Sequence, residues 1–328
     1  MVLPGNRIVK TTVAVFLTAF LCHLIGWPPV FAVITAIVTL EPTVSDSIKK
    51  GIIRFPASAI GSFYAVLFIA LFGNSPITYT VAASLTIITC YRLKLHAGLL
   101  VATITAVAMI EVVYDNYLLA FFIRLGTTTI GIVVSTLVNM FILPPDYMKE
   151  INRNLKTIYQ SIGHVLGQVL QSEKSLTSEI NNIVKQIDKT EELIRYQQEE
   201  SFFHPLVDSK QENFATAKVQ LKTLRFIRYH ISNIDEHKFN ELSLETSDMK
   251  LIINATNDLA NYLQGSHSVQ VDDYEYKLRK LMRLFWMTSR PSNENTIQLP
   301  QELIIVYELI SIFHLVKQLM DMENQHSS

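Results

Sequence analysis

Six apolar runs, separated by short polar stretches, fill the first 145 residues of the chain. They cover about residues 8–25, 28–40, 55–72, 76–90, 97–113 and 117–143. A helix needs roughly 20 residues, with about 17–25 observed, to cross the hydrocarbon core of a membrane. The pattern therefore predicts six membrane-spanning helices, of which the second and the fourth are short, broken or extended by flanking residues.

The pattern changes after Pro144 and Pro145, where apolar residues recur three and four positions apart, as in amphipathic helices. These stripes predict helices over about residues 151–169, 176–194, 214–234, 247–264, 271–288 and 300–322. No segment alternates with the two-residue period of a strand. We therefore predict an all-α chain, with a six-span membrane domain over residues 1–145 and a helical bundle over residues 146–328.

The first domain repeats its own pattern after 70 residues. Residues 32–36 and 102–106 both read Ala-x-Ile-Thr-Ala. The same offset aligns an acid, an arginine and a glycine: Glu41 with Glu111, Arg54 with Arg124, and Gly61 with Gly131. Each copy holds three spans, an odd number, so the two copies must run in opposite directions across the membrane. Inverted repeats are typical of transporters, whose sites lie near the midplane between the copies.

Charge is distributed unevenly along the chain. The first 145 residues hold eight basic and four acidic side chains, and the other 183 hold 20 basic and 25 acidic ones. This balance gives no indication of nucleic-acid binding. Cys22 and Cys90 both lie in apolar runs, which argues against disulfides and against a cysteine metal site. Phosphate-binding loops, nucleophile elbows and zinc-binding helix motifs are absent from the sequence, so we predict no enzymatic activity, no cofactor and no metal.

Lysine and arginine in the short loops predict the orientation of the spans. On one side of a six-span arrangement lie Arg7, Lys10, Lys49, Lys50, Arg54, Arg92, Lys94, Lys149, Arg153 and Lys156. The loops of the opposite side contain no basic residue before Arg124. We therefore predict a multi-pass protein of the plasma membrane with both termini in the cytoplasm.

The repeated arginines, Arg54 and Arg124, are candidate substrate-binding residues. Their places in the pattern predict that each lies near the first turn of a helix, where free N–H groups and the helix dipole favour anions. A guanidinium also matches a carboxylate in shape. Thr35 and Thr105, in the second and fifth spans, join this candidate set as repeated polar residues. The alternative is that both arginines merely extend towards the lipid headgroups.

Other charged positions have weaker claims to a role. Glu41 and Glu111 each precede their arginine by thirteen residues and, with Lys50, are candidates for coupling or gating; the alternative is that both acids lie at solvated span ends. Three basic residues lie on one side of the first helix after the membrane domain: Lys149, Arg153 and Lys156. They suit contact with lipid headgroups, or they serve only as a topology signal.

Several motifs between residues 7 and 54 resemble a known family. They are an Arg-x-x-Lys-Thr start at Arg7, the run Leu-Ile-Gly-Trp-Pro-Pro at residues 24–29, Glu-Pro-Thr-Val at residues 41–44, and Ser-x-x-Lys-Gly-x-x-Arg ending at Arg54. Together they resemble the bacterial aromatic acid exporter family, part of a fusaric-acid-resistance-like group to which plant aluminium-activated malate transporters also look related. The resemblance implies six spans, a helical C-terminal domain, and efflux or conductance of organic anions. Such families favour Arg-x-x-Gly-Thr at the third span, and residues 54–57 depart from this pattern while residues 124–127 come nearer.

The combined expectation is a transporter that exports small organic anions, notably aromatic carboxylates. A passive anion channel and a membrane-anchored helical sensor or scaffold remain as alternatives. The expected partners are the anion, membrane lipids and a second copy of the chain in a homodimer, with no nucleic acid.

The predicted topology can be checked by labelling single cysteines in a chain that lacks Cys22 and Cys90. Cysteines at Asn74 and Asn116 are expected to react with an impermeant thiol reagent added outside intact cells, because both positions lie in predicted outer loops. Cysteines at Ser47 and Ser266 are expected to react only after the cells are opened, because both positions are predicted to lie on the cytoplasmic side. The opposite labelling pattern would reverse the orientation.

Overall fold

The computed structural model describes residues 5–112, 116–142, 146–172, 174–203, 208–237, 244–265, 271–289 and 299–327. Across these ranges every extended regular element is a helix and no strand occurs, which confirms the all-α prediction. The chain forms two compact units: Met1–Asp146 with Tyr196–Pro205, and Tyr147–Arg195 with Leu206–Ser328. Pro144 and Pro145, where we placed the domain boundary, lie outside the described residues.

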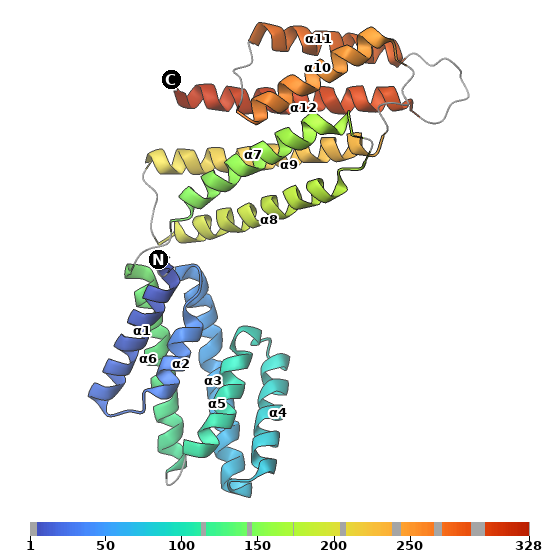
Figure 1. Ribbon diagram of the computed structural model, residues 1–328. Helices are drawn as coiled ribbons and strands as arrows, with labels where there is room; N and C mark the ends of the chain where they lie inside the picture. The colour runs from blue at the N-terminus through green and yellow to red at the C-terminus, as the bar shows by residue number, and fades with distance from the viewer. Residues whose placement is uncertain are drawn as a thin grey trace. The chain divides into compact units, whose positions relative to one another are not determined.

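The first unit contains a helix in each of the six predicted apolar runs (Figure 1). They are α1 (Asn6–Ile25), α2 (Val30–Thr39), α3 (Val44–Phe72), α4 (Pro76–Arg92), α5 (Leu99–Val112) and α6 (Tyr117–Phe141). A short 3-10 turn, η1 (His96–Gly98), leads into α5. The prediction that α2 would be short is confirmed, since this helix has 10 residues.

The third helix begins earlier than its apolar run. Thr43 caps α3, its hydroxyl accepting a hydrogen bond from the backbone N–H of Asp46 at 3.0 Å, and the helix then continues through Pro56. Arg54 is therefore the eleventh residue of α3, and Arg124 is the eighth residue of α6. The prediction that both arginines lie at helix starts is wrong, because the polar residues before Arg54 extend the helix instead of forming a loop.

The interior of the first unit contains many polar side chains besides apolar ones, while large apolar side chains lie on its surface. Fully buried hydroxyls include those of Thr18, Thr35, Ser58, Ser62, Thr86, Thr105, Thr128 and Ser135. At least 63% of the surface is exposed in each of these large apolar residues: Phe16, Ile52, Leu118, Phe122 and Phe141. This distribution reverses that of a water-soluble domain and suits a surface that contacts lipid.

Four described helices are long and apolar enough to cross a membrane: Arg7–Ile25, Val44–Phe72, Tyr117–Phe141 and Gln301–Met322. Val30–Thr39 and His96–Glu111 are apolar but shorter. The first three candidates belong to the unit whose surface is apolar, and the fourth belongs to the second unit.

Two glycines permit close helix contacts at positions that are 70 residues apart. A methyl group placed on Gly61 in α3 would lie 2.3 Å from the carbonyl oxygen of Ala102 in α5. One placed on Gly131 in α6 would lie 2.5 Å from the carbonyl oxygen of Ala32 in α2. Ala32 and Ala102 are themselves 70 residues apart, so the same contact occurs twice. Helix α3 thus packs closely on α5, and α6 packs closely on α2.

The second unit contains the C-terminal helices, at the places that the amphipathic stripes predicted. They are α7 (Met148–Val169), α8 (Thr177–Glu200), α9 (Asp208–Asp235), α10 (Thr246–Leu263), α11 (Val271–Thr288) and α12 (Gln301–Ser327), with the last turn of α8 belonging to the first unit. Helix α7 contacts α9 and α10, and α12 contacts α9, α10 and α11. Ile305, Phe313 and Leu319 of α12 are buried in this core.

Substitution of either close-contact glycine is expected to destabilise the first unit. Gly61→Ala and Gly131→Ala each place a methyl group against a backbone carbonyl that cannot rotate away, so the helices must separate at a cost of about 1–3 kcal/mol. Gly5→Ala is the matched control, because a methyl group there meets nothing within 4 Å. Thermal unfolding of the purified chain in detergent measures the difference. Equal melting temperatures for all three variants would contradict the close packing.

Candidate functional site

A small cavity lies inside the first unit, beside Arg124. It has a volume of about 160 Å³ and is lined by Pro28, Phe31, Met109, Ala120, Ile123, Arg124 and Thr127, which come from α2 and the residues before it, α5 and α6. Apart from Arg124 and Thr127, the lining side chains are apolar. The cavity therefore combines one cation with an apolar wall.

Among the described residues, no carboxylate contacts the guanidinium of Arg124. One of its terminal nitrogens donates to the hydroxyl of Thr128 at 2.6 Å, and the other donates to the hydroxyl of Thr105. Its central carbon lies 4.5 Å from the centre of the Phe31 ring. Only 3% of Arg124 is exposed, its Nε has no hydrogen-bond partner, and no ion pair of this arginine occurs within the described residues. Arg124 is thus fixed in place while its charge remains uncompensated.

Arg54, the counterpart of Arg124, forms an ion pair with Glu41. One of its terminal nitrogens lies 2.7 Å from a carboxylate oxygen of Glu41, and Lys50 lies 2.9 Å from the other oxygen. The Nε of Arg54 donates to the backbone oxygen of Ala97 at 3.2 Å. The structure therefore brings together three of the predicted site residues in one cluster at the N-terminal half of α3.

The carboxyl group of Glu41 lies in the loop between α2 and α3, where opposing effects act on its pKa. Partial burial works to raise this pKa, but the hydrogen bonds and charges of Lys50 and Arg54 outweigh the burial and lower it below the ordinary value of 4.5. Glu41 is therefore ionised throughout the physiological pH range and acts as a permanent counter-charge.

The sequence pattern did not reveal the polar residues that surround this cluster. Asn139 of α6 donates to the backbone oxygen of Glu41 at 3.1 Å and to the hydroxyl of Ser47 at 3.0 Å. Lys10 of α1 donates to the side-chain oxygen of Asn139 at 2.7 Å. Lys10 is only 7% exposed, although we assigned it solely to the topology signal. The sequence signal that could have revealed its burial is that Lys10 lies inside the first apolar run, at residues 8–25, and not in the segment before it.

Acidic residues from the end of α8 meet the first turn of α3 within the same unit. A carboxylate oxygen of Glu200 accepts the backbone N–H of Val44 at 3.0 Å, and Glu199 accepts the hydroxyl of Thr43 at 3.2 Å. A carboxylate at a helix start compensates free N–H groups and the helix dipole. The N-terminus of α3 is thus already occupied by an anion.

The remaining predicted residues occupy separate places. Thr35 donates to the backbone of its own helix at Phe31, 2.8 Å away, so it does not reach either arginine. Glu111 is exposed and accepts the hydroxyl of Tyr79. The pairing of Glu41 with Arg54 is therefore not repeated between Glu111 and Arg124.

The basic residues of α7, predicted to meet lipid headgroups, have different neighbours in the structure. Arg153 lies 3.6 Å from Glu150, which also lies 3.5 Å from Lys189 of α8. Lys156 instead lines a cavity of the second unit. Lys149 is exposed. No cluster suited to a metal ion occurs in the described part of the chain.

The large apolar side chains on the surface and the buried polar and charged side chains inside together indicate a helical membrane protein. Residues 2–142 match the family described as aromatic acid exporter family member 1. This part of the chain belongs to the aromatic acid exporter family, as its motifs between residues 7 and 54 indicated.

Relatives of known sequence extend over the whole chain. A UPF0421 protein of Oceanobacillus iheyensis is 48% identical over 336 residues, which cover 98% of this chain and 96% of that protein. A UPF0421 protein of Bacillus cereus is 36% identical over 337 residues, covering 99% and 95% respectively. One from Staphylococcus saprophyticus is 33% identical over 315 residues, covering 93% and 95%.

Neutralising Glu41 is expected to destabilise the first unit by about 1–3 kcal/mol, because Glu41→Gln leaves two cations without their carboxylate. Combining it with Arg54→Met is expected to cost less than the sum of the two single changes.

The same contact predicts a pH dependence. A carboxyl whose pKa is lowered by folding contributes stability that is present above its ordinary pKa and is lost as the pH falls through its folded value. The stability difference between the native chain and Glu41→Gln should therefore be constant from pH 6 to 8 and shrink below about pH 4.5. Thermal unfolding of both proteins across this pH range measures the stability difference. If the difference already shrinks between pH 8 and pH 6, the pairing of Glu41 with Arg54 and Lys50 is contradicted.

Proposed function

We propose that the protein exports small organic anions, with aromatic carboxylates as the preferred cargo and Arg124 as the residue that binds the carboxylate. The observation that carries this proposal is the uncompensated guanidinium of Arg124 beside a small apolar cavity. Membership of an exporter family supports it.

The energetics of Arg124 favour an anionic ligand. A charged arginine inside a membrane costs roughly 2.5–3.5 kcal/mol on insertion scales unless a partner or water compensates it. Two threonine hydroxyls satisfy part of its donors but supply no negative charge. A carboxylate would complete the donors and neutralise the charge with a charge-assisted hydrogen bond.

The cavity also limits the size and kind of the anion. A volume of 160 Å³ corresponds to roughly five water molecules at about 30 Å³ each. This is below the range of about 300–1,000 Å³ typical of drug-sized ligands, and so favours a small acid. Phe31 lies directly beside the guanidinium, so it can cover the ring of a bound acid while Arg124 holds the carboxylate.

We place these residues in six spans formed by two inverted repeats, with both termini in the cytoplasm. Contacts that recur at an offset of 70 residues support this arrangement, as does the contact of Ser58 with Thr128, its own counterpart, at 3.1 Å. Arg54 precedes Ser58 by one helical turn, and Arg124 precedes Thr128 by one turn. In an inverted arrangement the two arginines then lie on opposite sides of this crossing point.

Helix α12 is not a span in this proposal, despite its apolar composition. Its buried Glu308 accepts a hydrogen bond from Asn233 at 2.7 Å and contacts His230, both in α9. Its apolar residues pack in the core of the second unit. In this proposal the second unit lies in the cytoplasm, and the predicted boundary after residue 145 separates it from the membrane domain. A plasma-membrane location and a homodimer remain parts of the proposal.

A charge-conserving substitution tests the role of Arg124. Arg124→Lys is expected to lower transport of labelled benzoate by at least about tenfold, because lysine lacks the planar fork of donors that fits a carboxylate. Arg54→Lys is the matched control and is expected to retain most activity, since lysine still pairs with Glu41. Uptake into inverted membrane vesicles, normalised to the amount of protein, measures both.

Wild-type uptake by Arg124→Lys would overturn the anion-binding role. Equal losses in both variants would show that the arginines act in the same way, against the asymmetry of their partners. A flux far above the turnover of a carrier in electrical recordings would replace the exporter by a passive channel.

A further inference from the structure

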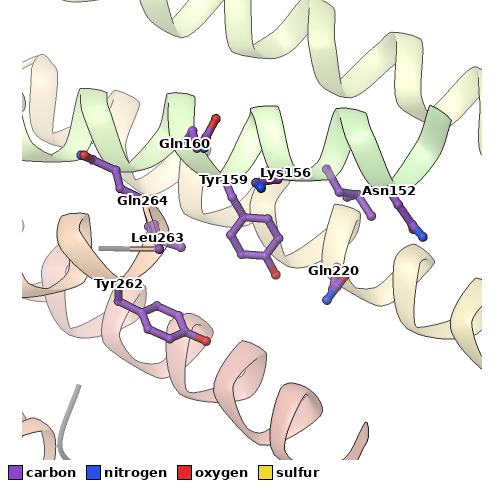
Figure 2. A pocket seen from close by; sticks show the side chains of 10 residues that line it. Asn152, Lys156, Tyr159, Gln160, Gln220, Tyr262, Leu263 and Gln264 are labelled. Carbon is purple, nitrogen blue, oxygen red and sulfur yellow. The ribbon is translucent and has the colours of Figure 1, made fainter. Parts of the chain in front are cut away.

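The second unit contains a cavity of about 490 Å³ that the transport site does not use. Figure 2 shows Tyr159 of α7 and Tyr262 of α10 projecting into this space, with Gln220 of α9 and Asn152 towards its far end. The volume falls within the range of about 300–1,000 Å³ typical of ligand sites. Its floor includes Leu155 and Leu263, which are 4% and 3% exposed.

Two glycines shape this cavity. Gly163 lets α10 approach α7 closely, since a methyl group there would lie 2.7 Å from the backbone oxygen of Ala260. Gly265 ends α10 with a φ of +72°, a value that glycine adopts without strain. The last turn of α10 is therefore held against α7, where it forms one wall of the cavity with Tyr262 and Leu263.

The residues that line the cavity carry one charge, which is positive. Lys156 is the single charged side chain among the lining residues, and no ion pair of Lys156 occurs within the described residues. The other polar groups are phenols and amides: Tyr159, Tyr262, Asn152, Gln160, Gln220 and Gln264. Lys156 is exposed at this open cleft, and as its single cation it favours a ligand that carries a single negative charge.

The helix end beside the cavity restricts the ligand further. It is the C-terminus of α10, which presents carbonyl oxygens and a partial negative charge. Phosphates prefer helix N-termini and clusters of donors, so this wall disfavours nucleotides. Carbonyl and amide oxygens suit a hydroxyl group of the ligand, and the tyrosine rings suit a planar ring.

We infer that the second unit binds a hydroxylated aromatic monocarboxylate in this cavity, with Lys156 on the carboxylate and Tyr262 against the ring. The inference rests on the proposed function only in that the ligand belongs to the same chemical class as the cargo. The chain then carries two sites for one class of molecule, one with Arg124 and one with Lys156.

Calorimetric titration of the purified full-length chain with 4-hydroxybenzoate tests this site. To isolate it, the titration uses Arg124→Lys, in which the transport site is weakened. Adding Lys156→Gln is expected to weaken the remaining binding by about tenfold or more, because a charge-assisted hydrogen bond is lost. Adding Tyr262→Leu is also expected to weaken it, and Tyr262→Phe should have a smaller effect because the ring is kept.

Lys222→Gln is the matched control, because it makes the same charge change two residues beyond Gln220, at an exposed position of α9 outside the cavity. Binding that is unchanged by Lys156→Gln, in protein with the native melting temperature, would overturn the inference. Loss of all binding in Arg124→Lys alone would also overturn it while leaving the proposed function intact. Conversely, binding that depends on Lys156, together with wild-type transport by Arg124→Lys, would support this site and refute the proposed function.

Discussion

The first unit is organised by the need to bury two guanidinium groups among apolar helices. A guanidinium stays charged at any physiological pH, so it cannot reduce the cost of burial by losing its proton. The structure meets this constraint in two ways. Arg54 receives a carboxylate from Glu41, whereas Arg124 receives two threonine hydroxyls and the face of Phe31. The first solution includes one carboxylate that Arg54 shares with Lys50, whereas the second includes none among the described residues.

Arg54 and Arg124 occupy equivalent positions of the repeat, but they have different surroundings. The cluster of Arg54, Glu41 and Lys50 extends through Asn139 to Lys10, and so it joins α1, α3 and α6 by hydrogen bonds. The surroundings of Arg124 contain a cavity instead of such a network. A hydrogen-bonded network near Arg54 and a cavity near Arg124 fit the proposed transport function, in which only Arg124 binds the anion.

Much of the fold followed from the sequence because it depends on local periodicity. Six apolar runs and six amphipathic stripes each became a helix, and α11 covers the residues predicted for it. The start of α3 was missed because hydrophobicity marks the part of a helix that meets lipid, not the whole helix. Ser47 and Lys50 belong to α3 although neither is apolar, since a hydroxyl and an amine can meet Asn139 and Glu41 inside the unit.

The candidate site was only partly accessible to sequence reasoning. The repeat drew attention to Arg54, Arg124 and Thr105, because equal residues at one offset form a visible pattern. Phe31 has no equal at position 101, and Asn139 has none at position 69, so the repeat could not mark them. Their importance comes from contacts across 93 and 98 residues of chain, to Arg124 and Glu41, which packing alone determines.

The contact of Ser58 with Thr128 has a consequence for the origin of the chain. If the proposed inverted repeat arose by duplication, one residue occupied both positions in the ancestor and met its own copy across the two-fold axis of a dimer of three-helix chains. In such a dimer a single substitution alters both sides of the contact at once, so it cannot produce two arginines with different partners. On this proposal the asymmetry between Arg54 and Arg124 arose only after the two copies were joined in one chain.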